Sequence, residues 1–490
     1  MDRKKAILKD ASSLSIATIL TQLINIVSAI LMRRFLGPVQ VGVWALVQIV
    51  LTYSEYTALG ASAAITLEIP LCQGKGETAK AENLKNTVFY FSLFTALATS
   101  AAILGYALWM KGSLSADVFW GLVIVSGLVI LQRINGIFVA LLRAFKQFSL
   151  ASRQMVISGL VNAALVAILS FQFKLYGFMC AMALSFLFNI VYLFFAGHLR
   201  FCYSLDPKAI RSLIAFGLPI VALTFFGSLY ETIDKIMIGR YLGLEQLGLY
   251  SIGLMTATYL YSIPNAVGVV MIPNIHEKFG RTSDKRDLQS FLDKSDLVFS
   301  TIMPCFIGLA WFGVPVAVEL FLPKFMGGIP ALRWLVLNVF FLAASQAYSQ
   351  CIYVFRQHKF FFPIFLFSSI CAISLIWLFI RAGWGIEGVA VATTTAMMVH
   401  FHVLYWFAVV QIRTSGEAWK AYLGIMARFI FMLAVLLALL QLVTPSNIFY
   451  TAALRLSLGF LIYVPFLWHL NQKMGLLRIL FKKKEVEALP

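Results

Sequence analysis

The sequence predicts an all-α integral membrane protein, and three observations support this prediction. The chain has 490 residues, of which 61% are hydrophobic and 12% are charged, whereas soluble domains average about 45–50% apolar and 25% charged residues. Apolar stretches of the roughly 20 residues that a helix needs to cross a bilayer recur along the chain. Short polar segments separate these stretches. Most of the chain is therefore expected to lie in lipid.

The hydropathy pattern predicts fourteen transmembrane helices. The expected spans are 11–32, 41–64, 87–109, 117–141, 151–171, 174–197, 212–234, 247–270, 297–322, 328–355, 360–380, 385–410, 421–443 and 448–470. The first span is longer than the apolar core of about 7–15 residues in a signal peptide, so we interpret it as an uncleaved helix. An even number of spans places both termini on the same side of the membrane.

Lysine and arginine residues predict the orientation. The two tails and the polar segments on the same side of the membrane carry 28 of these residues. The segments and helix ends on the opposite side carry nine. Cytoplasmic loops of membrane proteins carry the excess of positive charge. Both termini are therefore expected in the cytoplasm, and the protein is expected to be a multi-pass protein of the cell inner membrane. The net charge of +18 is spread over many segments, which argues against a nucleic-acid partner.

An internal repeat divides the predicted helices. Arg34–Gly37 (Arg-Phe-Leu-Gly) matches Arg240–Gly243 (Arg-Tyr-Leu-Gly) at an offset of 206 residues, and a weaker similarity pairs Gly177 with Gly388. Short matches of this kind arise easily by chance, but two of them at equivalent points of two six-helix blocks favour a true repeat. Because six is an even number, the two blocks are expected to be parallel.

The repeat predicts three regions: a six-helix lobe at 1–205, a second at 206–415, and two further helices with a basic tail at 416–490. Transporters of related architecture bind their substrate between two such repeats and expose it to alternate sides. We therefore expect two parallel six-helix repeats plus two C-terminal helices in a carrier that works by alternating access.

Several motifs resemble a known superfamily. They are Arg34–Gly42 after the first expected helix, Phe216–Pro219 at the start of the seventh, Asp234–Gly239 at its end, and Gly248–Tyr250 beyond it. These segments resemble the multidrug, oligosaccharidyl-lipid and polysaccharide (MOP) exporter superfamily, and within it the Wzx-type flippases. The resemblance extends over nearly the whole chain, whereas no single motif identifies a substrate.

The resemblance implies a MATE- and MurJ-like alternating-access bundle. It also implies a flippase that moves an undecaprenyl-pyrophosphate-linked oligosaccharide, such as an O-antigen or another surface polysaccharide unit, from the cytoplasmic to the outer leaflet. The expected partners are this lipid-linked oligosaccharide and the bilayer, with a polysaccharide polymerase and glycosyltransferases as further candidates. A monomer is favoured.

Arg133 is the main candidate for contact with the substrate, because it lies near the middle of an expected span with Gln132 and Asn135 beside it. Charged residues at this depth are costly and usually serve a function or pair with a partner. A guanidinium can bind a pyrophosphate with two parallel hydrogen bonds, and neighbouring amides can bind sugar hydroxyls. The alternative is a structural pair with a carboxylate such as Glu55, which could instead carry a proton.

Two further groups of polar residues are candidates. Gln22 and Asn25 share a helix face and could bind sugar hydroxyls or link helices, and Arg34 follows at the helix end. Glu231, Asp234 and Arg240 lie near the end of the seventh expected helix, as candidates for ion coupling or gating together with Glu55. A structural role is favoured for this second group, because helix-end charges can reach the interface.

No cofactor or metal is expected. His400 and His402 point to opposite sides of a helix and cannot easily bind one ion, and Gly74–Gly76 lacks the context of a phosphate loop. Two alternative functions stay open. One is a cation-coupled multidrug exporter of the same superfamily, which would need a more acidic cavity. The other is a membrane glycosyltransferase or polymerase, which would need larger outward loops with paired carboxylates.

Overall fold

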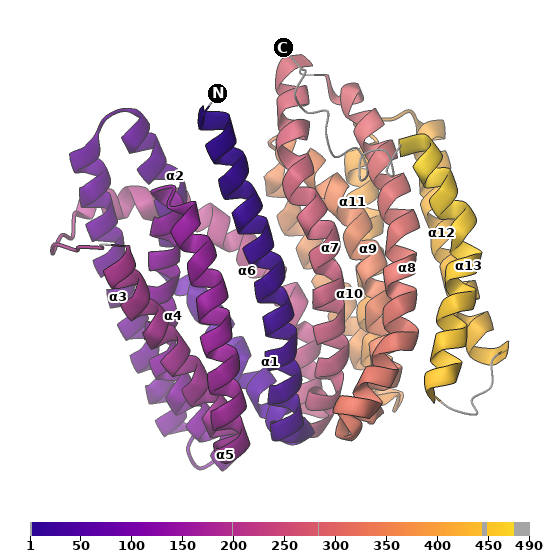
Figure 1. The fold of residues 1–490 in the computed structure, drawn as a ribbon, viewed down its shortest axis with the longest axis horizontal. Coiled ribbons are helices and arrows are strands. Elements are labelled where there is room, and N and C mark those ends of the chain that lie inside the picture. The colour runs from indigo at the N-terminus through magenta and orange to yellow at the C-terminus, as the bar shows by residue number, and fades with distance from the viewer. Residues whose placement is uncertain (1, 198, 283, 443–447, 475–490) are drawn as a thin grey trace. The chain divides into compact units, whose positions relative to one another are not determined.

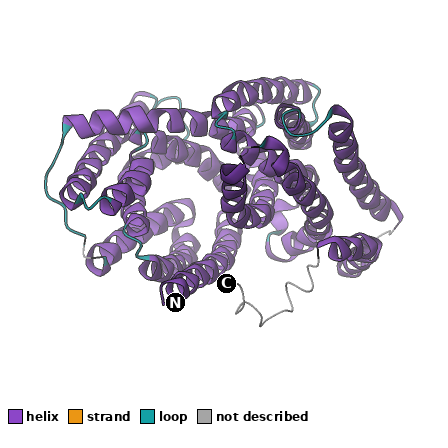
Figure 2. Ribbon diagram, turned by 90° about the horizontal axis from the view of Figure 1, so that it is seen from above, coloured by secondary structure: helices purple, strands orange, loops and turns teal. Residues whose placement is uncertain are grey.

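The computed structural model describes residues 2–197, 199–282, 284–442 and 448–474. Within these ranges all regular elements are helices and no strand is present, as Figure 2 shows. In the part of the chain that the structure describes, ten helices are long and apolar enough to cross a membrane. The prediction of an all-α, multi-pass membrane protein is therefore confirmed.

The chain forms two compact units, which divide between Gly248 and Leu249. The helices of unit 1 are α1 (Asp2–Ser54), the 3₁₀ helix η1 (Glu55–Ala58), α2 (Ala61–Gly74), α3 (Thr78–Trp109), α4 (Ala116–Ala144), α5 (Phe148–Ala196) and α6 (Pro207–Tyr241). Helix α7 (Leu244–Thr282) begins in unit 1 and continues into unit 2. The lobe boundaries at 205 and 415 stay a prediction.

Unit 2 contains the remaining elements. They are η2 (Lys285–Leu288), α8 (Gln289–Phe321), η3 (Pro323–Gly328), α9 (Ile329–Val354), η4 (His358–Phe360), α10 (Phe361–Arg381), α11 (Gly385–Val409), α12 (Ser415–Leu442) and α13 (Ile448–Met474). Helices α8, α12 and α13 contact one another and lie side by side (Figure 1). Several bulky aromatic side chains of α9 and α11 are fully buried, among them Phe340, Phe341 and Phe401.

Two of the ten candidate helices are too long for one crossing. They contain 43 and 49 residues, which at about 1.5 Å per residue is roughly twice the 30 Å thickness of a bilayer core. Each contains one residue with non-helical angles, Gly37 (φ 72°) in α1 and Lys174 (φ 50°) in α5. Each therefore accommodates two expected spans. A bent pair, Pro207–Ala215 with Gly217–Tyr241, is an eleventh candidate, so the structure is compatible with fourteen spans without confirming that number.

The expected span 41–64 is not one continuous helix, and this detail of the prediction was wrong. Helix α1 ends at Ser54, and η1 follows it. Leu59 (φ 49°) and Gly60 (φ 85°) then take left-handed backbone angles before α2 begins. Glycine adopts such angles readily, and a leucine does so rarely. The second span is therefore interrupted at Ser54–Gly60, a segment that we call the α1–α2 break.

The structure reproduces the sequence repeat. Gly37 (φ 72°) and Gly243 (φ 94°), which are equivalent in the first match, both take left-handed backbone angles. In the second match, a Cβ on Gly177 would lie 3.0 Å from the Cβ of Phe173, and one on Gly388 would lie 2.5 Å from the Cβ of Trp384. The backbone angle therefore recurs in the first pair, and a close contact with the residue four positions earlier recurs in the second.

The core of unit 1 lies between α2, α3, α4 and α5. Fully buried apolar side chains from these helices form one cluster, including Ile65, Ile69, Val88, Leu141 and Leu193. All apolar positions of a membrane helix look alike by hydropathy, since lipid and protein interior are equally apolar. The buried cluster is therefore visible only in the folded chain.

An extended segment between α5 and α6 is attached to this core. The ring of Phe201 stacks on Phe89 of α3, with 4.1 Å between the ring centroids, and on Phe138 of α4 at 5.6 Å. Lys85 Nζ donates a hydrogen bond to the Arg200 carbonyl oxygen at 2.7 Å. We call residues 199–206 the docked linker.

Candidate functional site

Arg133 is buried inside unit 1, with 2% of its surface exposed. Its Nη2 atom donates hydrogen bonds to the backbone carbonyl of Ser54 and to Thr57 Oγ1, the latter at 3.1 Å. Its Nη1 atom lies 3.5 Å from Thr95 Oγ1. Thr99 Oγ1 completes the group with a hydrogen bond of 2.9 Å to Thr57 Oγ1. Four segments, α1, η1, α3 and α4, therefore meet at this guanidinium.

These contacts follow from the α1–α2 break. A helix end leaves carbonyl groups without partners, and such groups are costly in an apolar medium unless they are hydrogen-bonded. Helix α1 ends at Ser54, whose carbonyl accepts from Arg133. In this structure Arg133 therefore caps the C-terminus of α1 in the interior of unit 1. The break and its cap lie far apart in the sequence, which explains why sequence reasoning missed them.

Glu55 does not pair with Arg133 in this structure. Among the described residues, no carboxylate oxygen lies within 4.0 Å of its guanidinium. Glu55 is partly exposed and begins η1, directly after the carbonyl that Arg133 caps. Its negative charge is therefore nearby without forming an ion pair. This arrangement leaves the guanidinium bound by neutral oxygen atoms.

Gln132 and Asn135 lie on the same helix as Arg133, and both are partly buried. Gln132 Oε1 is buried without a hydrogen bond, as is Arg133 Nε. Asn135 Oδ1 accepts from Asn189 Nδ2 of α5, and Asn189 Oδ1 accepts from Ser158 Oγ at 2.7 Å. Asn135 therefore belongs to a hydrogen-bond network between α4 and α5. Gln132 Oε1 and Arg133 Nε, a few positions earlier on α4, are free to form further hydrogen bonds.

The candidates on α1 lie apart from this group. Gln22 is partly buried, whereas Asn25 and Arg34 are exposed. The neighbour Arg33 is the buried member of the arginine pair, at 8% exposure, and its Nη1 donates to the Ala29 carbonyl at 3.2 Å. The structure gives no contact between these three candidates and Arg133.

The α6 candidates differ in burial. Asp234 is 4% exposed, whereas Glu231 and Arg240 are exposed. The face of α6 that carries Thr232 contacts the end of α1, where Tyr53 Oη lies 2.6 Å from Thr232 Oγ1. Helix α6 therefore packs against the region of the α1–α2 break. Of its two carboxylates, Asp234 is buried and Glu231 is exposed.

Gly217, from the Phe216–Pro219 motif, packs at the same place. A Cβ on Gly60 would lie 2.3 Å from Gly217 Cα, and a Cβ on Gly217 would lie 2.5 Å from the Leu59 carbonyl oxygen. Real Cβ atoms do not approach other atoms so closely, so only glycine fits at both positions. The motif that carried the resemblance therefore lets α6 approach the α1–α2 break.

An ionic cluster around the buried Arg413 of unit 2 was not predicted from the sequence. The Nη2 atom of Arg413 lies 2.7 Å from Asp293 Oδ1 and 3.2 Å from Asp296 Oδ2. Tyr348 Oη donates to both oxygens of Asp296, at 2.8 and 2.7 Å. Burial alone lowers the pKa of an arginine, but Tyr348, Asp296 and Asp293 outweigh burial and raise the pKa of Arg413 above its ordinary value. The only sequence signal was the three-residue spacing of the two aspartates.

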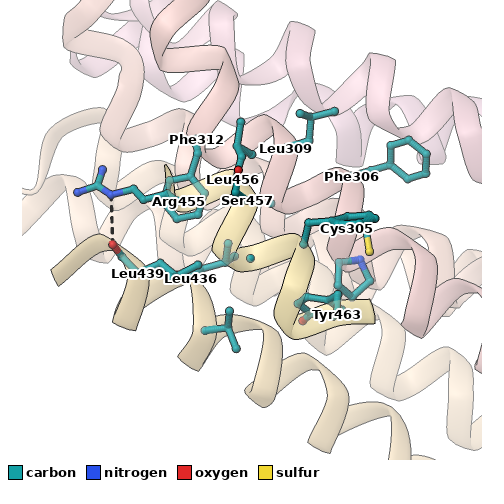
Figure 3. A pocket seen from close by; sticks show the side chains of 15 residues that line it. Cys305, Phe306, Leu309, Phe312, Leu436, Leu439, Arg455, Leu456, Ser457 and Tyr463 are labelled. Carbon is teal, nitrogen blue, oxygen red and sulfur yellow. Dashed lines mark hydrogen bonds between the residues drawn. The ribbon is translucent and has the colours of Figure 1, made fainter. Parts of the chain in front are cut away.

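An apolar cavity of about 550 Å³ lies between α8, α12 and α13. Its walls carry mostly aliphatic and aromatic side chains, among them Leu309, Phe312, Leu436, Leu439 and Phe460. Figure 3 shows Arg455 at one end of this cavity, with its Nε atom donating to the Leu439 carbonyl at 3.1 Å. The arginine thus binds carbonyls near the end of α12. The cavity can hold a hydrocarbon chain.

The family follows from a comparison with known proteins. The family model described as polysaccharide biosynthesis protein matches residues 7–279, which is more than half of the chain. The chain belongs to this family. No curated protein matches the chain. The prediction that the chain belongs to a polysaccharide biosynthesis family is confirmed.

Solved structures share the fold. The lipid II flippase MurJ, in an inward closed conformation, matches with a TM-score of 0.70 and 18% identity, over 94% of this chain and 99% of that chain. An inward-facing MATE family multidrug resistance transporter of the MOP superfamily matches with a TM-score of 0.69 and 14% identity, over 86% and 98%. A MOP superfamily transporter from Pyrococcus furiosus reaches 0.59 and 15%, over 82% and 95%. The predicted MATE- and MurJ-like architecture is confirmed.

Proposed function

We propose that this polysaccharide biosynthesis family member is a flippase for an undecaprenyl-pyrophosphate-linked oligosaccharide, such as an O-antigen or another surface polysaccharide unit. Its family membership carries the proposal, because it assigns the chain to polysaccharide biosynthesis. A fold shared with a lipid II flippase supports a lipid-linked substrate. Translocation runs from the cytoplasmic to the outer leaflet of the inner membrane by alternating access, with both termini in the cytoplasm.

The apolar cavity of unit 2 supports the lipid part of this proposal. Its volume of about 550 Å³ is of the size that binding sites for small molecules have. Its wall is built by α8, α12 and α13, and α12 and α13 are the helices that the sequence repeat leaves over. We propose that part of the polyprenyl chain occupies it while the saccharide crosses.

The unused buried polar atoms of α4 support the saccharide part. Arg133 Nε and Gln132 Oε1 lack hydrogen bonds, and buried polar atoms of this kind have an unmet demand for a partner. We propose that Arg133 binds the pyrophosphate when the α1–α2 break rearranges, with Gln132, Asn135, Gln22, Asn25 and Arg34 binding sugar hydroxyls or phosphate oxygens. We propose that the α1–α2 break moves away from Arg133 in this step, because Ser54 and Thr57 each hold the guanidinium by one hydrogen bond.

Coupling is proposed for the carboxylates next to the break. Glu55 belongs to η1, and Asp234 lies on α6, which packs against the same region. Protonation or ion binding at Glu55, Asp234 and Glu231, with Arg240 at the helix end, would then change how α6 and α1 pack. Polysaccharide polymerase and glycosyltransferases are proposed partners, and the monomer is the proposed form.

A translocation assay tests the function. Proteoliposomes with the purified chain and a polyprenyl-pyrophosphate-linked disaccharide should expose the sugar to an external lectin faster than protein-free liposomes do. Arg133→Ala should remove the acceleration and Arg133→Lys should keep part of it, because a point charge survives without the bidentate geometry. Arg281→Ala, at an exposed arginine, is the control. Unchanged translocation with Arg133→Ala would remove Arg133 from the site, and export of cationic drugs without any lipid translocation would replace the proposed function by multidrug export.

A further inference from the structure

A second cavity of unit 2, of about 610 Å³, has a different chemistry from the apolar one. It lies where α8 and α12 begin and α13 ends. Five basic side chains line it, Lys294, Arg413, Lys420, Arg428 and Lys473, against three acidic ones, Asp293, Asp296 and Glu417. We call it the cationic cavity.

The three carboxylates of the cationic cavity already have partners. Asp293 and Asp296 both accept from Arg413, at 2.7 and 3.2 Å. Glu417 Oε2 accepts from the backbone nitrogen of Thr414 at 3.0 Å and from its hydroxyl at 2.8 Å. The three carboxylates therefore already accept hydrogen bonds from Arg413 and Thr414.

Apart from Arg413, which is paired with Asp293 and Asp296, the basic side chains retain most of their binding capacity. Lys294, Lys420 and Lys473 are exposed, and none forms an ion pair with another described residue. Arg428 donates one hydrogen bond, of 3.0 Å, to Ser300 Oγ. The unused donors of the cationic cavity are therefore those of Lys294, Lys420, Lys473 and Arg428, because the side chain of Arg413 is only 1% exposed. A concave surface with unused cationic donors is suited to an anion.

The surroundings indicate which anion this is. A third cavity of about 320 Å³ shares Arg428 with the cationic cavity and Tyr463 with the apolar cavity. The three cavities thus form a series along α8. From Asp293 to Leu309 the helix rises about 24 Å at 1.5 Å per residue. A ligand that fits this series has a negatively charged head and a long apolar chain.

We propose that the cationic cavity binds the phosphate group of a lipid whose hydrocarbon chain extends toward the apolar cavity. Guanidinium and ammonium groups are the usual ligands of phosphate, and basic pockets between transmembrane helices bind lipid head groups. A membrane phospholipid and a polyprenyl pyrophosphate both offer this chemistry. The site therefore does not rest on the proposed flippase function.

The test measures lipid binding to the full-length purified protein in an uncharged detergent. The probes are dioctanoyl phosphatidylglycerol, farnesyl pyrophosphate, the uncharged dioctanoylglycerol and inorganic phosphate. At least one of the two anionic lipids should bind about tenfold more tightly than dioctanoylglycerol and inorganic phosphate, and its affinity should fall with added salt. Preference for phosphatidylglycerol identifies a membrane phospholipid as the source, and preference for farnesyl pyrophosphate identifies a prenyl carrier.

The double change Lys420→Gln and Lys473→Gln should weaken anionic lipid binding about tenfold, because each cation near a lipid phosphate contributes to the affinity. Both side chains are exposed, so the fold should be retained. The matched control is Lys75→Gln with Lys80→Gln, two exposed lysines of unit 1 on the side predicted to be cytoplasmic, which should change binding less than twofold. Equal losses in both variants would overturn the proposal. So would equal binding of charged and uncharged lipids, or binding of inorganic phosphate as tight as that of the lipids.

Discussion

Gly42 and Gly248, which are 206 residues apart in sequence, pack in reciprocal positions. A Cβ on Gly42 would lie 1.7 Å from the Leu244 carbonyl oxygen, and a Cβ on Gly248 would lie 1.8 Å from the Pro38 carbonyl oxygen. Pro38 and Leu244 are separated by the same offset. The two junctions that match in sequence therefore cross each other symmetrically, and only glycine fits at the two closest points.

Gly248→Ala and Gly42→Ala are each expected to destabilise the protein. The added methyl would clash with a backbone carbonyl, which cannot move aside as a side chain can. Overpacking costs about 1–3 kcal/mol or more. A lower melting temperature of the detergent-purified protein, and lower abundance in the membrane, would show this effect.

Gly127→Ala is the matched control, because a Cβ there meets nothing within 4 Å. This residue lies inside α4, where alanine is favoured over glycine by about 0.5–1 kcal/mol. Its melting temperature should stay unchanged or rise. If all three variants melt alike, the reciprocal contact is wrong.

Phe201→Ala should release the docked linker. Phe201 stacks on Phe89 and Phe138, and the Arg200 carbonyl accepts from Lys85. Losing a partly buried ring should cost about 1–3 kcal/mol, below the 3–5 kcal/mol of a fully buried phenylalanine. Trypsin should then cut after Arg200 faster than in the wild-type protein, as peptide mapping of short digests would reveal.

Tyr203→Ala controls for the loss of an aromatic ring in the same linker. Tyr203 is 76% exposed and contacts only Tyr90 among the described rings, at 5.1 Å. Cleavage after Arg200 should be nearly unchanged in this variant. Rapid cleavage of the wild-type linker would contradict the docking itself.

Arg413→Gln should strongly destabilise unit 2. The change leaves Asp296, which is buried, without its cation. Breaking a buried ion pair from one side typically costs about 3–5 kcal/mol, because the other charge stays buried. Melting temperatures should show a large loss in Arg413→Gln and a partial recovery when Asp296→Asn is added.

The exposed pair Arg281–Glu277 provides the comparison, since its side chains are 76% and 60% exposed. Arg281→Gln should change stability by less than about 1 kcal/mol, as surface pairs do. A similar loss at the two arginines, or no recovery in the double variant, would speak against a buried cluster at Asp296.

Reporter fusions test the orientation predicted from the charge distribution. Fusions after residues 80, 205 and 285 should report the cytoplasm, and those after 112 and 325 the outside. The reason is the excess of 28 over nine basic residues on the side of the termini. A reversal at any one of these five points would break the assignment of fourteen spans.

Much of the fold was predictable because it depends on local composition. Long apolar stretches such as 117–141 are expected to form helices in lipid, since only a helix pairs every backbone group within a single segment. The ends of α4 lie within three residues of that prediction. The repeat was visible because Gly37 and Gly243 are required by backbone geometry at both junctions. A position with left-handed backbone angles favours glycine, so such a position can be recognised in the sequence.

The sequence by itself determined that this is a helical membrane protein with two related halves, and it singled out Arg133 as an unusual charge in an apolar helix. Only the tertiary structure decided what Arg133 contacts, because its partner is the backbone carbonyl of Ser54, where the α1–α2 break begins. Backbone groups carry no mark in the sequence. For the same reason, the contacts of Arg413 with Asp293 and Asp296 were hidden: hydropathy says which side chains are polar, and only folding brings distant ones within hydrogen-bonding distance.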